Sequence, residues 1–257
     1  MTYHVLNGDA LVERFLGTGL SGQMVVAREC LIEGDLQGET PLEFYKTRAR
    51  YIKATYFESE ESYFTRVASE YEKLMTSPDN TEFNLWFGYD LFCQANLWFV
   101  LSILYDLQIQ KQIYVIYPFH LGEESIWQDY AGATSAVLKD CFNKRILFTK
   151  NDLELGKDLW AALKTKDLAG LERLSKQKSS CFPYLGVVCR AHIDRFPKQG
   201  KKGRPERVVE EIIEDTGSNF IDVFNQFSKR EGVYGFGDCQ VKPIYDKVLN
   251  DHKLNLS

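Results

Sequence analysis

The feature that most constrains this chain is the segment DLFCQANLWFVLSILYDL, residues 90–107, which has helical length and is apolar on almost every side. A helix without a polar face must be covered all round, either inside a protein or inside a membrane. Its most apolar part, residues 91–104, contains Gln94 and Asn96 and is shorter than the ~20 apolar residues of a membrane span. We therefore expect a helix buried in a soluble protein.

Short apolar segments alternate with helical segments around it. Strands are expected at residues 3–6, 23–27, 82–87 and 112–118, and further helices at 10–16, 42–52 and 60–75. This alternation is typical of βαβ units and a parallel sheet. Residues 1–125 are thus predicted to form a Rossmann-like α/β domain, in which the strand order is not deducible from the sequence.

The remainder, residues 126–257, is predicted to be a mainly helical domain. Helices are expected at 133–142, 152–164, 167–177, 183–195, 205–215, 219–229 and 241–249. A basic, glycine-rich loop, PKQGKKGRPER (197–207), is the clearest internal boundary in this half. Residues 203–249 follow as helix, turn, helix, a glycine-rich hairpin-like piece and a helix, which could form a winged-helix-like module.

Composition limits the classes of function. The net charge of −5 argues against wholesale nucleic-acid binding, although a local basic patch stays open. The opening residues MTYHVLNGDA lack the basic and apolar pattern of a secretory signal, so a cytoplasmic location is expected. The six cysteines are scattered without a C-x-x-C pair, which in a cytoplasmic chain is typical of free thiols.

Polar residues follow each predicted strand. In open α/β sheets, ligands bind beyond the carboxyl ends of the strands, and parallel strands place these ends at one edge. We predict a site there for a small polar, phosphorylated or nucleotide-like ligand. Asp9 and Asp90 are the predicted catalytic carboxylates, acting as general acid and base. The predicted ligand-binding residues are Asn7, Gly8, Arg28, Glu29, Glu33, Gln94, Tyr117 and His120.

Several of these residues also have a structural interpretation. Asp9 and Asp90 each precede a helix, so either could be its N-cap. Arg28 and Glu29 could form only a surface ion pair, and His120 could be an ordinary loop residue. Gln94 is more readily interpreted as part of a pocket wall. It lies four residues after Asp90, on the same face of the helix, and a buried amide needs hydrogen-bond partners.

Several motifs were tested and excluded. The segment GDAL resembles the G-D-S-L block of an esterase superfamily, but Ala10 replaces the nucleophilic serine. Neither G-x-G-x-x-G after the first strand nor a Walker loop is present. The histidines lack metal-ligand spacing, so no metal site is predicted, although Asp9 and Asp90 could hold Mg²⁺. No motif indicates a cofactor.

Three segments together, HVLNGDAL, ARECLIEGDL and LWFGYDLFCQANLWFVLSIL, resemble an uncharacterised bacterial family of unknown function. That family has an Asn-Gly-Asp-Ser/Ala-Leu strand end and a Trp-Phe-x-x-Asp-x-Phe-x-Gln motif, and the similarity extends to GRPERVVEEII and VYGFGDCQ. The resemblance implies no reaction. The matching residues are Gly8, Asp9, Ala10, Leu11, Arg28, Glu29, Leu31, Glu33, Gly34, Trp86, Phe87, Asp90, Phe92, Gln94 and Asn96.

The main alternative is a non-enzymatic regulator whose C-terminal module binds DNA or a protein partner. Basic residues in the loop 197–207 favour it, while the acidic helix 205–215 opposes it. The module could instead pack on the first domain as a lid, with Asp238 and Gln240 closing over the pocket. A third interpretation assigns the aromatic residues to an oligomer interface.

Overall fold

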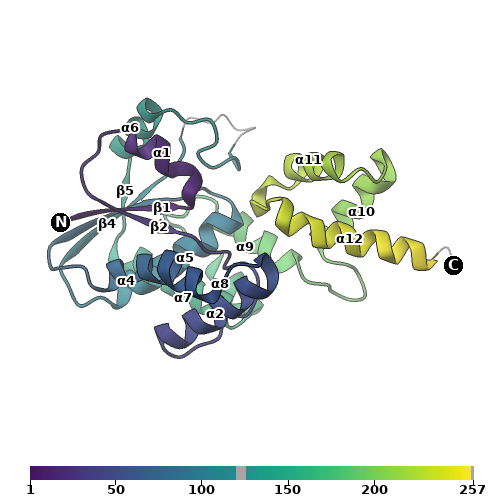
Figure 1. Cartoon of the computed structure of the whole chain (residues 1–257), viewed down its shortest axis with the longest axis horizontal. Coiled ribbons are helices and arrows are strands. Elements are labelled where there is room, and N and C mark those ends of the chain that lie inside the picture. The colour runs from purple at the N-terminus through teal and green to yellow at the C-terminus, as the bar shows by residue number, and fades with distance from the viewer. Residues whose placement is uncertain (120–125, 256–257) are drawn as a thin grey trace.

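The computed structural model describes residues 1–119 and 126–255, which contain a five-stranded sheet in the order β2-β1-β3-β4-β5 (Figure 1). Its strands are β1 (Thr2–Asn7), β2 (Gln23–Ala27), β3 (Thr81–Trp86), β4 (Lys111–Ile116) and β5 (Ile146–Leu147). The first four are parallel, and β5 is antiparallel to β4. The predicted α/β fold with a Rossmann-like parallel sheet is confirmed. Only β5, which is too short to show a periodic pattern, was not expected.

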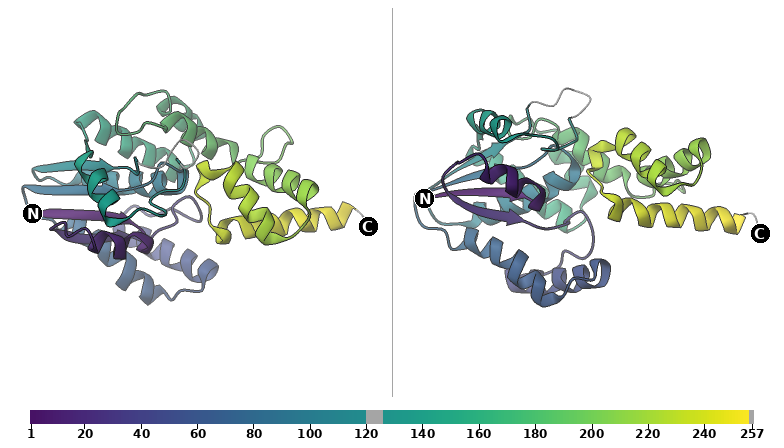
Figure 2. Two further views of the ribbon diagram at one scale, coloured as in Figure 1. Left: turned by 90° about the horizontal axis from the view of Figure 1, so that it is seen from above. Right: turned by 45° about the horizontal axis from the view of Figure 1, so that its top comes forward.

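Helices cover both faces of the sheet (Figures 1 and 2). One face carries η1 (Asp9–Leu11), α1 (Val12–Leu16) and α6 (Ser135–Asn143). Because side chains alternate along a strand, Leu6 and Trp86 are buried on this face, whereas Val5 and Leu85 belong to the larger core on the other face. The sheet is therefore the middle of three layers.

The larger core lies under a layer of helices built around α5. This layer contains α2 (Pro41–Tyr56), α3 (Glu60–Tyr63), the π-helical η2 (Phe64–Ala68), α4 (Ser69–Met75), α5 (Leu91–Asp106), α7 (Lys150–Lys164), α8 (Leu168–Leu174) and α9 (Leu185–Asp194). As predicted, α5 is buried, and it packs along α7. None of the helices in the described residues is both long and apolar enough to cross a membrane.

The α/β layer continues beyond residue 125, where we expected a domain boundary. β5 extends the sheet, α6 contacts α1, and α7 contacts α5, so the second half of the chain completes the layer. Contacts of η4 (Gly232–Tyr234) with α9 and α5 also join the C-terminal helices to this layer. The boundary near residue 125 rests on the end of the strand–helix alternation, a local pattern that does not report tertiary packing, and it stays a prediction.

The C-terminal module follows this loop and lies beyond the end of the sheet at which β1 stops (Figure 1). It consists of α10 (Arg204–Thr216), α11 (Phe220–Arg230), η4 (Gly232–Tyr234) and α12 (Asp238–Asn255). No strand forms between residues 204 and 255, so the expected hairpin-like wing is absent from this range and η4 takes its place. The module is a helical cap on the strand ends.

Candidate functional site

The candidate site lies where β1 and β3 end side by side. The chain leaves β1 toward β2 on one side, while β3 and β4 lie on the other, so β1 and β3 flank the point at which the strand order reverses. Such switch points are the usual ligand crevices of open α/β sheets. Two cavities open here, with volumes of about 460 Å³ and 1310 Å³, and both are lined by Asn7 and Phe92. We call them the first and second cavities.

Asn7 is the last residue of β1 and is held by α5. Its Nδ2 donates to Sγ of Cys93 at 3.0 Å, and its Oδ1 accepts from Nδ2 of Asn96 at 3.0 Å. Gly8 then turns the chain into η1 with a φ of 87°, a backbone conformation that favours glycine. Asn7 and Gly8 therefore line the first cavity, and the side-chain amide of Asn7 is hydrogen-bonded to α5; their role in ligand binding stays a prediction.

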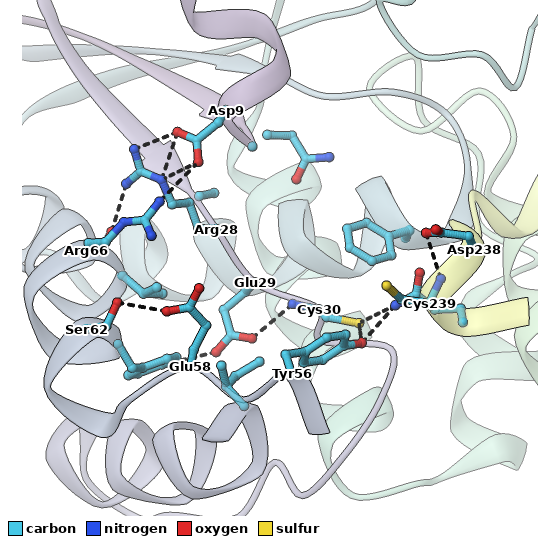
Figure 3. A pocket seen from close by; sticks show the side chains of 18 residues that line it. Asp9, Arg28, Glu29, Cys30, Tyr56, Glu58, Ser62, Arg66, Asp238 and Cys239 are labelled. Atoms are coloured by element: carbon cyan, nitrogen blue, oxygen red, sulfur yellow. Dashed lines mark hydrogen bonds and ion pairs between the residues drawn. The ribbon is translucent and has the colours of Figure 1, made fainter. Parts of the chain in front are cut away.

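Asp9 lines the first cavity, where it pairs with arginine side chains (Figure 3). Nη2 and Nε of Arg28 donate to its carboxylate at 2.7–2.9 Å, and Nη2 of Arg66 lies 3.8 Å from Oδ2. The hydrogen bonds from Arg28 lower the pKa of Asp9. Its side chain makes no cap hydrogen bond, so the N-cap interpretation of Asp9 is wrong. Asp9 is an ionised partner that positions Arg28.

Glu29 forms a buried ion pair on the floor of the first cavity. Its carboxylate accepts from Nη2 of Arg48 at 2.8 Å and from the hydroxyl of Tyr63 at 2.5 Å, and both charged side chains are 0% exposed. The surface ion pair between Arg28 and Glu29 that the sequence left open does not form. Since a buried charge needs such a partner, the carboxylate of Glu29 supports the site and is not free to bind ligand.

Glu33 lies outside both cavities. Its Oε2 accepts from the hydroxyl of Tyr56 at 3.1 Å, and Nε2 of Gln240 donates to that hydroxyl at 2.8 Å. Burial is the main cause that raises the pKa of Tyr56. This chain of hydrogen bonds connects the loop after β2 to the start of α12. Through Tyr56, Glu33 thus links the α/β layer to the C-terminal module by hydrogen bonds.

Gln94 and Tyr117 are also buried, and neither is among the residues that line the first or the second cavity. Nε2 of Gln94 donates to the carbonyl of Gly88 at 2.7 Å and to the hydroxyl of Tyr117 at 3.3 Å. The Tyr117 hydroxyl donates to the carbonyl of Cys181 at 2.8 Å. The pair holds the turn after β3 and is not the pocket wall that we expected. His120, the remaining predicted residue, lies outside the described residues.

Asp90 caps α5 and lines the second cavity. Its Oδ1 accepts from the backbone N–H of Cys93 at 2.9 Å, which confirms the N-cap interpretation. The residue is only 2% exposed, and this burial raises the pKa of Asp90. Oδ1 of Asp90 is thus engaged by the cap, while its Oδ2 lies 3.0 Å from the Cβ position of Gly88.

Asp129, which the sequence did not single out, lies beside Asp90. A Cβ built on Gly88 would be 2.9 Å from Oδ1 of Asp129, 3.0 Å from Oδ2 of Asp90 and 3.0 Å from Sγ of Cys93. Oδ1 of Asp129 is buried and has no hydrogen-bond partner among the described residues. Burial and the charge of Asp90 raise the pKa of Asp129 to about 8. Its loop has no periodic pattern, so no sequence signal marked it.

The C-terminal module completes both cavities. Asp238, Cys239 and Gln240 at the start of α12 line the first cavity (Figure 3), and residues 224–236 line much of the second. The lid position expected for Asp238 and Gln240 agrees with this arrangement. The site is therefore built by residues from both ends of the chain, and a ligand in it would contact the sheet edge and the module together.

Metal binding has little support here. Within residues 1–119 and 126–255, no three His, Cys, Asp or Glu side chains form a group that could hold a metal ion. Asp9 and Asp90, the pair considered for Mg²⁺, line different cavities, and Asp9 is already bound to Arg28.

Comparison with known proteins gave no match among family models, curated proteins or solved structures. The geometry of the site is therefore the basis for any function, and the resemblance noted in the sequence stays a prediction.

Proposed function

We propose that the protein binds a small polar ligand in the two neighbouring cavities at the ends of β1 and β3, which share Asn7 and Phe92 as lining residues. The observation that carries the proposal is the convergence of polar side chains from three distant segments, residues 7–9, 90–93 and 238–240, on hollows at the strand-order switch point. The first cavity, of about 460 Å³, lies within the range of about 300–1000 Å³ that is typical of small-molecule sites, and the second, of about 1310 Å³, is larger.

The charges around the cavities favour a ligand that presents hydrogen-bond donors. Asp90 and Asp129 line the second cavity, and Glu58 and Asp238 line the first. Sugar hydroxyls or amines are suitable partners for these carboxylates. An anionic group would bind best beside Arg66, whose side chain is 58% exposed and only loosely paired with Asp9. A nucleotide-like ligand would use both regions, with its ribose toward the carboxylates.

The test is a thermal-shift screen of the full chain against ribose, adenosine, AMP and ATP, each with and without Mg²⁺. A ligand at 100 times its Kd should stabilise the fold by ~2.7 kcal/mol. The pocket variants are Arg66→Gln and Asp238→Asn, which come from different halves of the chain. Arg50→Gln is the matched control, because Arg50 is exposed and bonds only within α2.

A shift in the wild type and in Arg50→Gln that is reduced in both pocket variants supports the proposal. An equal shift in all four proteins would place the ligand elsewhere. No shift with any compound of the panel would count against this ligand class.

The alternative, a regulator whose C-terminal module binds DNA, has weaker support. Two basic side chains of the module and one of the loop before it are paired with carboxylates: Lys247 with Glu206 at 2.8 Å, Arg204 with Glu231 at 2.9 Å, and Lys202 of the loop with Glu210 at 2.8 Å. Phosphate binding would have to displace these carboxylates. An electrophoretic shift of non-specific DNA at low salt that disappears as salt rises would revive this alternative.

A further inference from the structure

The buried carboxyl group of Asp90 and the half-buried one of Asp129 both line the second cavity. The distances from the Gly88 Cβ position place Oδ1 of Asp129 and Oδ2 of Asp90 around one point, with Sγ of Cys93 beside them. We propose that Asp129, as the acid, and Asp90, as the base, form a general acid–base pair that acts on a hydroxyl-bearing ligand. This inference rests on the proposed ligand site and replaces the pair Asp9 and Asp90 that the sequence indicated.

The first argument is the unpartnered oxygen of Asp129. A buried carboxylate oxygen without a donor loses its hydration and gains nothing in return. Oδ1 of Asp129 is in this position and lines the second cavity. A ligand hydroxyl would supply the missing partner, and so would a proton on the carboxyl group itself.

The second argument is the charge around the pair. Like charges at close range disfavour double ionisation, so one of two adjacent carboxyls keeps its proton. From α1, the positive charge of Arg14 opposes this and lowers the pKa of Asp129, but burial and Asp90 outweigh it. Lys229 and Glu231 of the module also line the cavity, with opposite charges. Asp129 is therefore the protonated member at neutral pH.

The charges and hydrogen bonds together set the roles. Burial raises the pKa of both carboxyls and a backbone N–H opposes it at each, Cys93 at Asp90 and Tyr130 at Asp129, but the charge of Asp90 raises the pKa of Asp129 further, so we assign Asp90 as the carboxylate of the pair. Burial is the main cause that raises the pKa of Cys93 well above its usual range. The thiol therefore stays protonated, and Asn7 donates to its sulfur. Cys93 is a neutral neighbour of the pair and not a competing base.

The proton transfer is balanced. The bond between the reacting centre of the ligand and its leaving oxygen breaks, and the leaving oxygen keeps that electron pair and takes the proton of Asp129, which becomes a carboxylate. The attacking hydroxyl gives its proton to the Asp90 carboxylate, and the electron pair of its broken O–H bond forms the new bond between its oxygen and the same centre. The pair gives one proton and takes one, so that at the end Asp90 is protonated and Asp129 is a carboxylate.

The first experiment needs no ligand. The full chain, labelled with ¹³C at aspartate carboxyl carbons, is titrated by NMR from pH 4 to 9, as wild type, Asp129→Asn and Asp90→Asn. Asparagine at 90 keeps the helix cap, so the fold should persist. We expect one carboxyl to titrate near pH 8, to be absent in Asp129→Asn, and to shift to lower pH in Asp90→Asn. If every aspartate titrates below pH 5 in the folded wild type, the proposal is overturned.

The second experiment asks whether the proton is available to a bound molecule. A small diazo ester converts protonated carboxyl groups into esters, releasing N₂, and leaves ionised ones unchanged. At pH 6.5 we expect peptide mapping to find the ester on Asp129, with less ester at pH 9 and less in Asp90→Asn. Asp9, ionised by its bond to Arg28, is the internal control and should stay unmodified.

The two proposals fail in different ways. A raised titration without ester formation would make Asp129 a buried structural carboxyl and overturn the catalytic role. A raised titration with ester formation supports the pair even if the ligand screen finds nothing, in which case only the ligand class of the proposed function has failed.

Discussion

Gly235 of the C-terminal module lies directly against the carboxylate of Asp90 at the end of the sheet. A Cβ at position 235 would be 1.9 Å from Oδ1 of Asp90, and the φ of Gly235 is +63°. Any other residue would meet both a backbone penalty and a collision. This contact closes the second cavity and couples the module to the candidate carboxyl pair.

Replacing Gly235 by alanine should lower the free energy of unfolding for two reasons: the left-handed backbone conformation and the collision of the new Cβ with Asp90. Gly19 is the matched control, because its φ is +67° and a Cβ there would meet nothing within 4 Å. Gly19→Ala should cost about 1–2 kcal/mol for the left-handed conformation. Gly235→Ala should cost about 1–3 kcal/mol more for overpacking. Urea denaturation measures both, and equal losses would mean that the module does not press on Asp90.

The buried ion pair of Arg48 and Glu29 should be essential for stability. Arg48→Leu leaves the Glu29 carboxylate buried without its charge partner, and we expect a loss of about 3–5 kcal/mol. The control is Lys53→Leu, which removes an exposed pair with Glu60 and should cost about 0–1 kcal/mol. Denaturant midpoints compare the two. A loss for Arg48→Leu no larger than that of its control would contradict the burial of the pair.

The stability of the fold should depend on Asp129 above pH 4. The pKa of Asp129 is raised to about 8 in the folded state, so the folded chain binds more protons than the unfolded chain between about pH 4 and pH 8. Wild-type stability should therefore fall through this window relative to Asp129→Asn. Melting temperatures should agree at pH 4.5 and diverge by several degrees at pH 8, with the variant higher. A difference in melting temperature between the two proteins that stays constant from pH 4.5 to pH 8 would exclude a raised pKa of Asp129.

Asp9 should contribute with the opposite sign and at lower pH. Its pKa is lowered by Arg28, so its stabilisation is complete above its unfolded pKa of about 4 and is lost as the pH falls through the lower folded value. Because its side chain is 56% exposed, the effect of Asp9→Asn at pH 7 should be only about 0–1 kcal/mol. Denaturation at pH 7 and pH 2.5 tests this. If Asp9→Asn lost more unfolding free energy relative to the wild type at pH 2.5 than at pH 7, the pKa of Asp9 would not be lowered in the folded state.

Gly156 should be required for the close packing of α7 on α5. A Cβ at this position would lie 2.6 Å from Cδ1 of Leu101, so Gly156→Ala should destabilise by about 1–3 kcal/mol. Gly186 in α9 has only an ordinary contact at 3.5 Å, and Gly186→Ala should stabilise by up to about 1 kcal/mol through helix propensity. Thermal unfolding of both variants should show shifts of opposite sign, and stabilisation by both would mean that the helices can separate without loss.

Much of the candidate site was predictable, but its pairings were not. Asn7, Gly8 and Asp90 could be placed at the strand ends because a strand, a turn and a helix cap each depend on a few neighbouring residues. Glu29 was also placed near the site correctly, yet its partner, Arg48, lies in another helix. Whether a polar side chain faces a cavity or a buried partner depends on residues that are far away in the sequence. Gln94 is an example: its helix was predicted correctly, but its amide is hydrogen-bonded to Gly88 and Tyr117 and does not line either cavity.

The sequence by itself determined the local structure of this protein. The short apolar segments predicted the strands of the parallel sheet, and the segment that is apolar on almost every side predicted the buried helix α5. Each prediction was possible because the apolar positions show which faces of a segment must be shielded from water. The tertiary structure alone decided the strand order, the pairing of Asp9 with Arg28, and the meeting of Asp90 with Asp129 under Gly235. These depend on distances between residues far apart in the chain, which only the packing of the layers creates.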